Sequence, residues 1–547
     1  MLGSLRNRSP LALAILVLAL CLTAGRPAAA DPVGDGIQAL AGKSFNDKLA
    51  AVDRLAATGD ARAVPVLQAL LDGRLFVRKA DGKVVVTEKK GRVYLVTDPL
   101  SGAEIGEAKT RALKKIRINN KLRGALRGAL GGLTLLSPDR DQRLDAAWAV
   151  FKARDAGSLA ILERALARET DDQVRDAMRM AQAATTLFAV DETEARKTAL
   201  GVLSETADPE VRALLGQFLS ELGEEADPAV REMARTALDD VESQLAFWGF
   251  VANLFQGVSL GSVLLLAAVG LAITFGVMGV INMAHGELVM LGAYTTFVIQ
   301  ELFRAYAPGA FDWSVPVAIP AAFLVAGAFG VAIERGVIRY LYGRPLETLL
   351  ATWGLSLILQ QLVRSIFGPT NREVGAPSWM SGAIEATGGL VLTYNRIWII
   401  LFSLAVILLL GIALRKTAFG LQMRAVTQNR RMAGSMGIRT GRVDALTFGL
   451  GSGIAGMAGV ALSQIDNVSP NLGQSYLIDS FLVVVFGGVG NLWGTLVGAF
   501  SLGLVNKFLE PVAGAVLGKI LVLVAIILFI QRRPRGLFAL KGRAIEQ

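Results

Sequence analysis

The pattern of apolar and polar positions divides the chain into two unlike stretches. Residues 31–243 carry apolar side chains at helical intervals, for example at Leu49, Val52 and Leu55, which predicts amphipathic helices. From residue 244 onward, apolar stretches follow one another almost without interruption. They fall at about 248–281, 284–304, 313–334, 346–367, 397–414, 443–464, 476–490, 492–509 and 513–531. A hydrocarbon core about 30 Å thick needs about 20 helical residues, so residues 244–547 predict a polytopic helical membrane domain.

The two ends of the chain limit the number of crossings. Residues 1–30 have the features of a signal peptide, with Arg6 and Arg8 before an apolar stretch at 11–23 and small residues at 28–30. A cleaved leader places residue 31 outside the cytoplasm, whereas the Arg-rich segment after residue 531 favours the cytoplasm. The number of complete crossings is then odd, and we expect about nine.

The net charge of +10 raises the question of a nucleic-acid partner. The basic residues, however, gather beside apolar segments. Residues 415–442 contain seven Lys or Arg residues and no acidic residue, and residues 335–344 carry three further arginines. This asymmetry is typical of cytoplasmic loops between membrane helices. We therefore expect a lipid-bilayer protein and no nucleic-acid partner.

A short unit recurs in the N-terminal stretch. It reads DDQVR at 171–175, DPEVR at 208–212 and DPAVR at 227–231. Asp suits the N-cap of a helix, and Pro209 and Pro228 suit the first helical turn, where a missing N–H costs nothing. The pattern predicts a helical-repeat array of HEAT-like type, whose units bury their apolar faces by stacking.

One β-rich segment interrupts the predicted repeats. Residues 83–87 and 93–96 are rich in Val, and Asp81-Gly82 is a turn dipeptide, so a small β-hairpin is expected there. The predicted fold is thus an all-α polytopic membrane protein (domain 244–547) with a periplasmic repeat domain at 31–243 that contains this hairpin. The repeat domain is expected to dock or space the membrane domain; alternatively, its extended surface grips a periplasmic partner.

Glycine is dense in the later apolar segments. Small residues at intervals of three and four let membrane helices approach closely. The FGGVGN run at 486–491 differs because consecutive glycines weaken a helix. It indicates either close packing or a broken helix whose freed backbone groups line a polar cavity.

Polar residues within apolar segments give the candidate substrate pathway. Such residues are costly in a membrane and usually face a cavity or a partner. They are Asn282, His285, Glu287, Thr352, Ser356, Gln360 and Asn491. Thr352, Ser356 and Gln360 share one helix face because they are four residues apart. Uncharged donors and acceptors suit a neutral polar solute. In the alternative interpretation, His285 and Glu287 are structural residues near the start of a helix.

Catalytic and metal-binding motifs are missing from the sequence. The single cysteine, Cys21, lies in the expected leader, and His285 is the only histidine. The segment at 514–520 lacks the spacing of a phosphate-binding loop. We expect no enzyme activity, metal or cofactor, so a nucleotide that drives transport must bind another chain. Residues 415–442 are the expected contact with that chain; otherwise they form an ordinary basic loop.

Several motifs in order along the chain carry a resemblance to a known family. They are NMAHGELVMLGAY at 282–294, TWGLSLILQQLVRSIFG at 352–368, the loop 417–438, FLVVVFGGVGNLWGT at 481–495 and RRPRGLF at 532–538. Together they resemble the branched-chain-amino-acid-type permeases of ABC importers over residues 250–540. ATWG at 351–354, YNR at 394–396, the stretch 469–495 and the secreted helical extension are similar to the urea permease branch.

The resemblance implies an inner-membrane permease subunit of a bacterial urea importer. Its implied partners are a second related permease, two cytoplasmic ATPase subunits and a periplasmic binding protein. It places the ATPase-coupling loop at 417–438, although the Glu-Ala-Ala pattern of other importers is absent. The coupling residues expected there are Phe419, Gly420, Arg424, Ala425, Asn429, Ala433 and Gly437.

Three other functions remain open on the sequence. An importer of the same class could carry branched-chain amino acids or short amides. A channel or facilitator would need no ATPase. A membrane-anchored sensor is disfavoured because anchoring does not need so many crossings.

Overall fold

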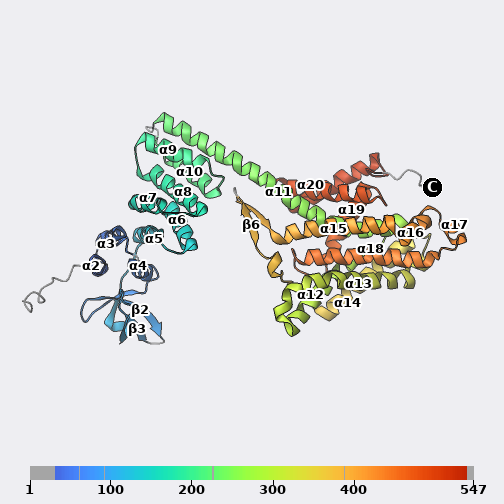
Figure 1. The fold of residues 1–547 in the computed structure, drawn as a ribbon, viewed down its shortest axis with the longest axis horizontal. Helices are drawn as coiled ribbons and strands as arrows, with labels where there is room; N and C mark the ends of the chain where they lie inside the picture. Colours follow the sequence, from blue (N-terminus) through green and yellow to red (C-terminus); the bar gives the residue numbers. More distant parts are fainter. Residues whose placement is uncertain are drawn as a thin grey trace, which may run out of the picture. The chain divides into compact units, whose positions relative to one another are not determined.

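The computed structural model describes residues 31–42, 44–60, 62–90, 93–223, 227–386 and 389–538. The expected signal peptide at 1–30 lies outside the described residues. The chain divides into two compact units between Gln244 and Leu245, and each is described by itself (Figure 1).

The N-terminal unit is mostly helical. Its α-helices are α2 Pro32–Ala39, α3 Phe45–Thr58, α4 Ala63–Leu71, α5 Asn120–Thr134, α6 Arg140–Ala153, α7 Leu159–Leu166, α8 Asp172–Ala189, α9 Thr193–Ser204 and α10 Pro209–Glu221. The predicted caps are confirmed. Asp171 accepts from the Val174 amide at 3.1 Å, and Asp208 accepts from the Glu210 amide at 2.7 Å. Asp227 caps the next helix in the same way.

The β-rich insertion is larger than the predicted hairpin. Its strands are β1 Leu75–Arg78, β2 Val84–Lys90, β3 Val93–Thr97, β4 Glu104–Ala108 and β5 Leu113–Lys115. The expected hairpin is β2 and β3, which pair antiparallel from Val86↔Thr97 to Lys90↔Val93. They lie within a five-stranded sheet of order β4-β3-β2-β1-β5. The pattern missed β4 and β5 because β4 is almost wholly exposed and β5 has three residues.

The second unit is a bundle of long apolar helices. They are α11 Pro228–Met278, which begins in the N-terminal unit, α12 His285–Tyr306, α13 Ser314–Gly336, α14 Pro345–Phe367, α15 Tyr394–Lys416, α18 Thr440–Ser463, α19 Leu472–Gly487 and α20 Leu492–Arg532. Among the residues that the structure describes, six helical stretches are long and apolar enough to cross a membrane. The two short helices α16 Ala418–Gln428 and α17 Arg430–Ser435 separate α15 from α18. A two-stranded hairpin, β6 Ala383–Ala386 and β7 Leu390–Thr393, precedes α15.

Helix α20 reverses direction partway along its length. Gly514 is non-helical, with φ 77° and ψ 161°. A Cβ atom on Gly518 would lie 3.5 Å from the Cβ of Leu509, whereas nine residues of straight helix would separate the two by about 13 Å. The reversal therefore divides α20 into two segments, which match the predicted stretches 492–509 and 513–531. Nine crossings remain a prediction.

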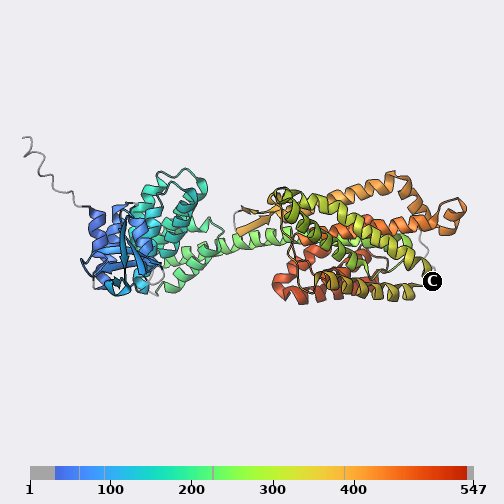
Figure 2. The ribbon, with the colours of Figure 1, turned by 90° about the horizontal axis from the view of Figure 1, so that it is seen from below.

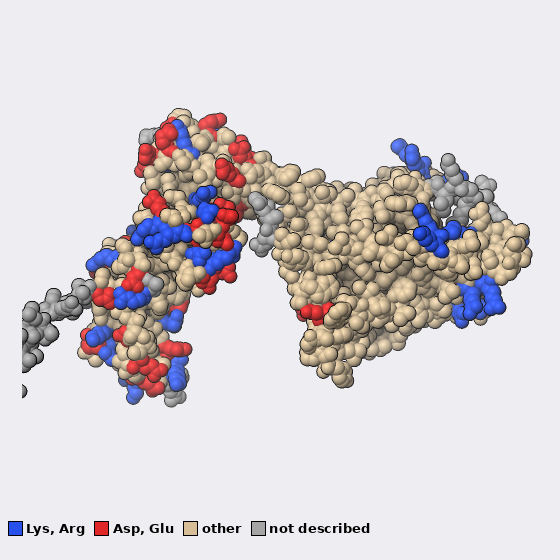
Figure 3. All heavy atoms as spheres, in the orientation of Figure 1, with Lys and Arg blue, Asp and Glu red and all other residues tan. Residues whose placement is uncertain are grey.

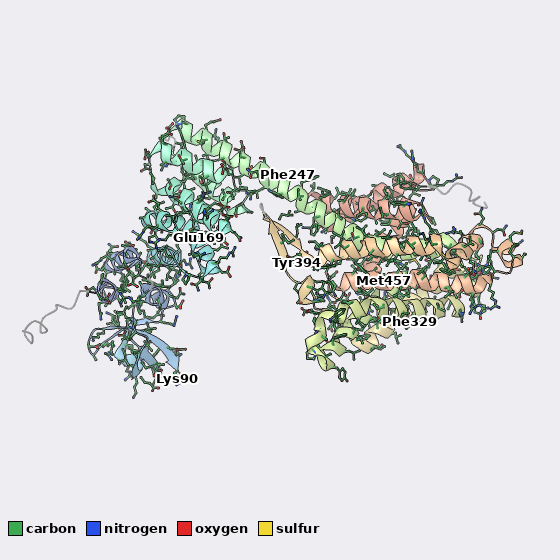
Figure 4. All side chains as sticks on the ribbon, in the orientation of Figure 1. Lys90, Glu169, Phe247, Phe329, Tyr394 and Met457 are labelled. Carbon is green, nitrogen blue, oxygen red and sulfur yellow. The ribbon has the colours of Figure 1, made fainter. Side chains whose placement is uncertain are left out.

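Close backbone approach holds the central helices together. A Cβ on Gly459 of α18 would lie 2.0 Å from the Val289 carbonyl oxygen of α12, and one on Gly292 would lie 2.0 Å from the Gly456 oxygen. No side chain fits at these positions. The predicted role of the glycines in tight packing is confirmed for α12 and α18. In Figure 4, Met457 marks this stretch of α18.

The glycine run at 486–491 ends one helix and starts another. The last carbonyls of α19 accept hydrogen bonds from a segment near the C-terminus, because Leu537 N donates to Phe486 O at 2.9 Å and Phe538 N to Gly487 O at 3.1 Å. Gly488, at φ +104°, takes a conformation that other residues rarely adopt. The run is thus a capped turn between α19 and α20.

Candidate functional site

One face of α14 carries a column of buried polar side chains, which we call the polar seam. Its members are Thr348, Thr352, Ser356 and Gln360, four residues apart and at most 5% exposed. The opposite side of the helix is apolar and open, with Leu350 62% and Ile358 64% exposed. The predicted sharing of one face by Thr352, Ser356 and Gln360 is confirmed, and Thr348 extends it.

The polar seam meets the carboxyl group of Glu287 near the start of α12. Glu287 Oε1 accepts from Ser356 Oγ at 2.9 Å and from Gln360 Nε2 at 2.8 Å. The other oxygen, Oε2, is buried and has no partner among the residues that the structure describes. Because a buried acceptor without a donor costs free energy, Oε2 is a place where a solute N–H or a water would be bound.

Two further contacts fasten the chain just before α12. Thr352 Oγ1 accepts from the Met283 amide at 3.1 Å, and Asn282 Oδ1 accepts from the Ala284 amide at 3.0 Å. Asn282 Nδ2 is buried without a partner within the described ranges. The segment before α12 and the face of α14 therefore form one polar contact region.

His285 faces a different helix. Its Nε2 lies 2.8 Å from the Ala267 carbonyl oxygen of α11, and the side chain is fully buried. Since a carbonyl oxygen only accepts, Nε2 donates there and Nδ1 is left as an acceptor. His285 thus joins α12 to α11, while Glu287 joins α12 to α14.

Asn491 makes none of its hydrogen bonds to the other pathway candidates. It is the N-cap of α20, and its Oδ1 accepts from Trp493 N at 3.0 Å and Gly494 N at 3.3 Å. Its Nδ2 lies 3.4 Å from the Phe538 carbonyl oxygen. Asn is a favoured N-cap residue, so this local role was readable from the sequence.

The predicted coupling loop folds as α16 and α17. A Cβ on Gly420 would lie 2.1 Å from the Leu414 carbonyl oxygen, and Arg424 donates to the same oxygen. These two residues hold α16 against the end of α15. Asn429 caps α17 by accepting from the Met432 amide at 3.0 Å. Figure 2 shows this segment, in orange, at one end of the membrane unit.

The remaining coupling candidates divide into buried and accessible positions. Ala433 is buried in a small cluster with Met423 and Val426, and Phe419 and Ala425 pack against that cluster. Gly437, at φ +83°, follows α17 in the left-handed region that favours glycine.

Three exposed apolar side chains on this segment were not predicted. Leu421 is 63% exposed, Met432 59% and Met436 79%. The sequence did offer a signal for them, because all three are apolar residues within the strongly basic segment 415–442. On the face drawn in Figure 3, Lys and Arg of the membrane unit gather around the end that carries α16 and α17. The segment thus presents apolar side chains within a basic rim, as protein-binding surfaces do.

The described part of the chain contains no group of three or more His, Cys, Asp or Glu side chains that could hold a metal ion.

Comparisons with known proteins identify the membrane unit. The family described as branched-chain amino acid transport system / permease component matches residues 253–530. The permease LivH of Salmonella typhimurium, named for high-affinity branched-chain amino acid transport, is 34% identical over 265 residues, which are 47% of this chain and 85% of LivH. BraD of Pseudomonas aeruginosa, with the same description, is 29% identical over 294 residues, which are 53% of this chain and 95% of BraD. No solved structure matches.

These matches define an ABC transporter permease, a multi-pass membrane transport component and not an enzyme. The chain belongs to the family of branched-chain amino acid transport system permease components. Permeases of ABC importers generally work with a second permease, ATPase subunits and a binding protein. The family match begins at residue 253 and leaves the N-terminal unit outside it.

Proposed function

We propose that this chain is a permease subunit of an ABC importer for urea in the bacterial inner membrane. It forms half of a pathway whose other half is a second, related permease. The observation that carries the proposal is the polar seam at Glu287, which lies inside the region that matches the permease family.

The chemistry of the polar seam suits a small, uncharged amide. Ser356 and Thr352 offer hydroxyl groups, Gln360 offers an amide, and Glu287 Oε2 is an acceptor without a donor. Urea carries N–H groups for such an acceptor and a carbonyl for the second N–H of Gln360, since the first is donated to Glu287. The hydroxyl hydrogens of Ser356 and Thr352 are donated to Glu287 and to backbone carbonyls, so these hydroxyls would act towards a solute as acceptors. The motifs shared with the urea permease branch favour the same solute.

ATP-driven switching is assigned to partner chains. One of the two ATPase subunits docks on α16 and α17, where Leu421, Met432 and Met436 are exposed. ATP binding to the ATPase subunits then shifts the equilibrium between two permease states. It can do so only because ATP binds more tightly to the complex in one state than in the other. A periplasmic binding protein delivers the solute, and the N-terminal unit lies on that side of the membrane, where it docks or spaces the permease.

Uptake in a strain that lacks only this chain tests the substrate. We expect loss of labelled urea uptake, with leucine uptake retained, and restoration by the wild-type gene. The variant Glu287→Gln should restore little uptake, whereas Glu301→Gln, a change at an exposed position of the same helix α12, should restore it fully. Loss of leucine uptake alone would contradict the urea assignment.

Branched-chain amino acid import is the second candidate. The names of LivH and BraD favour it, and the ammonium group of an amino acid would also pair with Glu287. Competition separates the two: an excess of unlabelled leucine should leave labelled urea uptake unchanged if urea is the solute. The same competition assay with an excess of unlabelled acetamide tests the remaining alternative, a short amide as the solute.

An ATP-independent channel makes a different prediction. Arg424 holds α16 by donating to the Leu414 carbonyl oxygen, so Arg424→Glu should disturb the ATPase dock. For an importer, this variant and ATP depletion each abolish accumulation against a gradient. Accumulation that survives both treatments would support the channel.

A further inference from the structure

Four residues at one end of the membrane unit connect the coupling segment to α14. Arg430, the first residue of α17, forms an ion pair with Asp444 of α18. Its guanidinium carbon also lies 4.4 Å from the centre of the Tyr342 ring. The hydroxyl of Tyr342 donates to Glu334 Oε1 of α13 at 3.1 Å.

Two of the carboxyl groups in these contacts are buried, so losing a partner would cost free energy. Asp444 is 1% and Glu334 2% exposed, and Asp444 Oδ1 has no partner within the described ranges. A buried carboxylate left without its cation is strongly unfavourable. Arg430 is on the coupling segment and its side chain is 42% exposed. A displacement of α17 therefore changes the partner of a buried charge and the group that stacks on Tyr342.

Tyr342 is joined directly to the start of α14. It lies three residues before Pro345, the first residue of that helix. Thr348 Oγ1 donates within this turn and lies 3.1 Å from Leu341 O and 2.9 Å from Arg344 O. Thr348 is also the first member of the polar seam, whose last members bond to Glu287. The turn at 341–344 leads into α14, and the polar seam of that helix runs from this turn to the contact at Glu287 near the middle of the helix.

We propose that Arg430 and Tyr342 are positioning residues that transmit movement of the ATPase-docking segment to α14. The inference rests on the proposed function as an ABC importer, whichever solute is carried. Helix α14 is suited to move because it is held on α12 by hydrogen bonds and exposes its apolar face, including Leu350 and Ile358. Transmission between two sites needs such an element with two arrangements that both sites bias.

The first test measures transport against ATP hydrolysis in the complete complex with its binding protein, reconstituted in lipid vesicles. In Arg430→Gln, ATPase subunits should still co-purify and hydrolyse ATP, while solute taken up per ATP falls about tenfold. Tyr342→Phe keeps the ring under Arg430 and loses the bond to Glu334, so its ratio should fall about fivefold. Arg430→Lys keeps the charge on Asp444 and should recover most of the ratio.

The matched control is Arg442→Gln. Arg442 lies two residues from Asp444 on α18, is exposed, and makes no side-chain hydrogen bond or ion pair with the described residues. It should leave the ratio unchanged. Unchanged ratios in both Arg430→Gln and Tyr342→Phe would overturn the proposal. Loss of the ATPase subunits from Arg430→Gln would also overturn it, because Arg430 would then be a docking residue.

The second test needs no transported solute and so separates this proposal from the urea assignment. Ser365 is exposed near the end of α14, and Cys21 is the only native cysteine. In a Cys21→Ser, Ser365→Cys background, trapping the ATPases with ATP and vanadate should change the rate of thiol labelling severalfold. Adding Arg430→Gln should abolish that change. An equal change with and without Arg430→Gln contradicts the relay, even if urea uptake is established.

Discussion

The two units of the chain differ in how completely a buried carboxylate is hydrogen-bonded. In the N-terminal unit, Glu169 is fully satisfied: Arg143 binds both oxygens, at 2.7 and 3.0 Å, and Oε1 also accepts from the amides of Thr170 and Asp171 (Figure 4 labels Glu169). In the membrane unit, Glu287 has one oxygen hydrogen-bonded, while the other has no partner among the described residues. Buried polar groups are usually hydrogen-bonded, so the open oxygen distinguishes Glu287 from Glu169.

The units also differ in what brings their helices together. Apolar side chains such as Leu67, Leu70 and Leu126 form the core of the N-terminal unit. In the membrane unit, backbones touch at glycines, because lipid gives little hydrophobic reason for helices to associate. Substitutions that enlarge a side chain at these glycines should therefore destabilise the membrane unit more than the N-terminal unit.

The largest effect is expected for Gly459→Ala. Its Cβ would lie 2.0 Å from the Val289 carbonyl oxygen, so α12 and α18 must separate at a cost of about 3 kcal/mol, the upper end of the usual range for overpacking. The yield and melting temperature of the subunit in detergent measure this. Gly411→Ala on α15 is the control, since nothing lies within 4 Å of that Cβ. Equal behaviour of the two variants would refute backbone packing as the main contact.

Glu169→Gln should cost about 2 kcal/mol, the usual loss for charge-assisted hydrogen bonds. The cost should appear as faster hydrogen exchange in α6 and α8, with the membrane helices unchanged. Glu163→Gln is the control, because Glu163 is an exposed residue of the neighbouring α7. Faster exchange across both units would show that their stabilities are linked.

The ion pair between Arg143 and Glu169 also makes the stability of the N-terminal unit depend on pH. The hydrogen bond that Arg143 donates to Glu169 holds the pKa of Glu169 below the usual value for Glu, which is about 4.3. The stabilisation is complete above the unfolded pKa and is lost as the pH falls through the lower, folded pKa. Exchange in α6 should therefore accelerate below about pH 4 in wild type, and the gap between wild type and Glu169→Gln should close. A constant gap at all pH values would exclude titration of this carboxyl group.

The smallest effect on stability is expected for Ser356→Ala. A single side-chain hydrogen bond between membrane helices contributes about 0.6 kcal/mol on average, so the melting temperature should hardly change. Solute uptake, by contrast, should fall, because Ser356 orients Glu287. Ser365→Ala is the matched control on the exposed side of the same helix. Equal uptake by both variants would remove the seam from the transport pathway.

Patterns of neighbouring residues predicted the helices and the faces that they bury, because these features depend on residues close together in the chain. The apolar stretches gave the helices, and the four-residue spacing on α14 gave the seam. The partner of that seam could not be read from spacing alone, since Ser356 and Glu287 are 69 residues apart. The contact of Arg430 with Tyr342 joins even more distant positions, and β4 has no alternating pattern to read. Asn491 was assigned to the pathway from its polarity, although its place before α20 gives it a capping role.

The cap on α19 has a consequence for the order of biosynthesis. The amides of Leu537 and Phe538 bond to the last carbonyls of that helix, yet about fifty residues of chain separate the two partners. The ribosome therefore delivers α19 to the insertion machinery well before its closing segment exists. In a nascent chain that stalls before this segment is made, the last carbonyls of α19 lack these two donors, so the end of that helix is completed only when the segment at 537–538 has been synthesised.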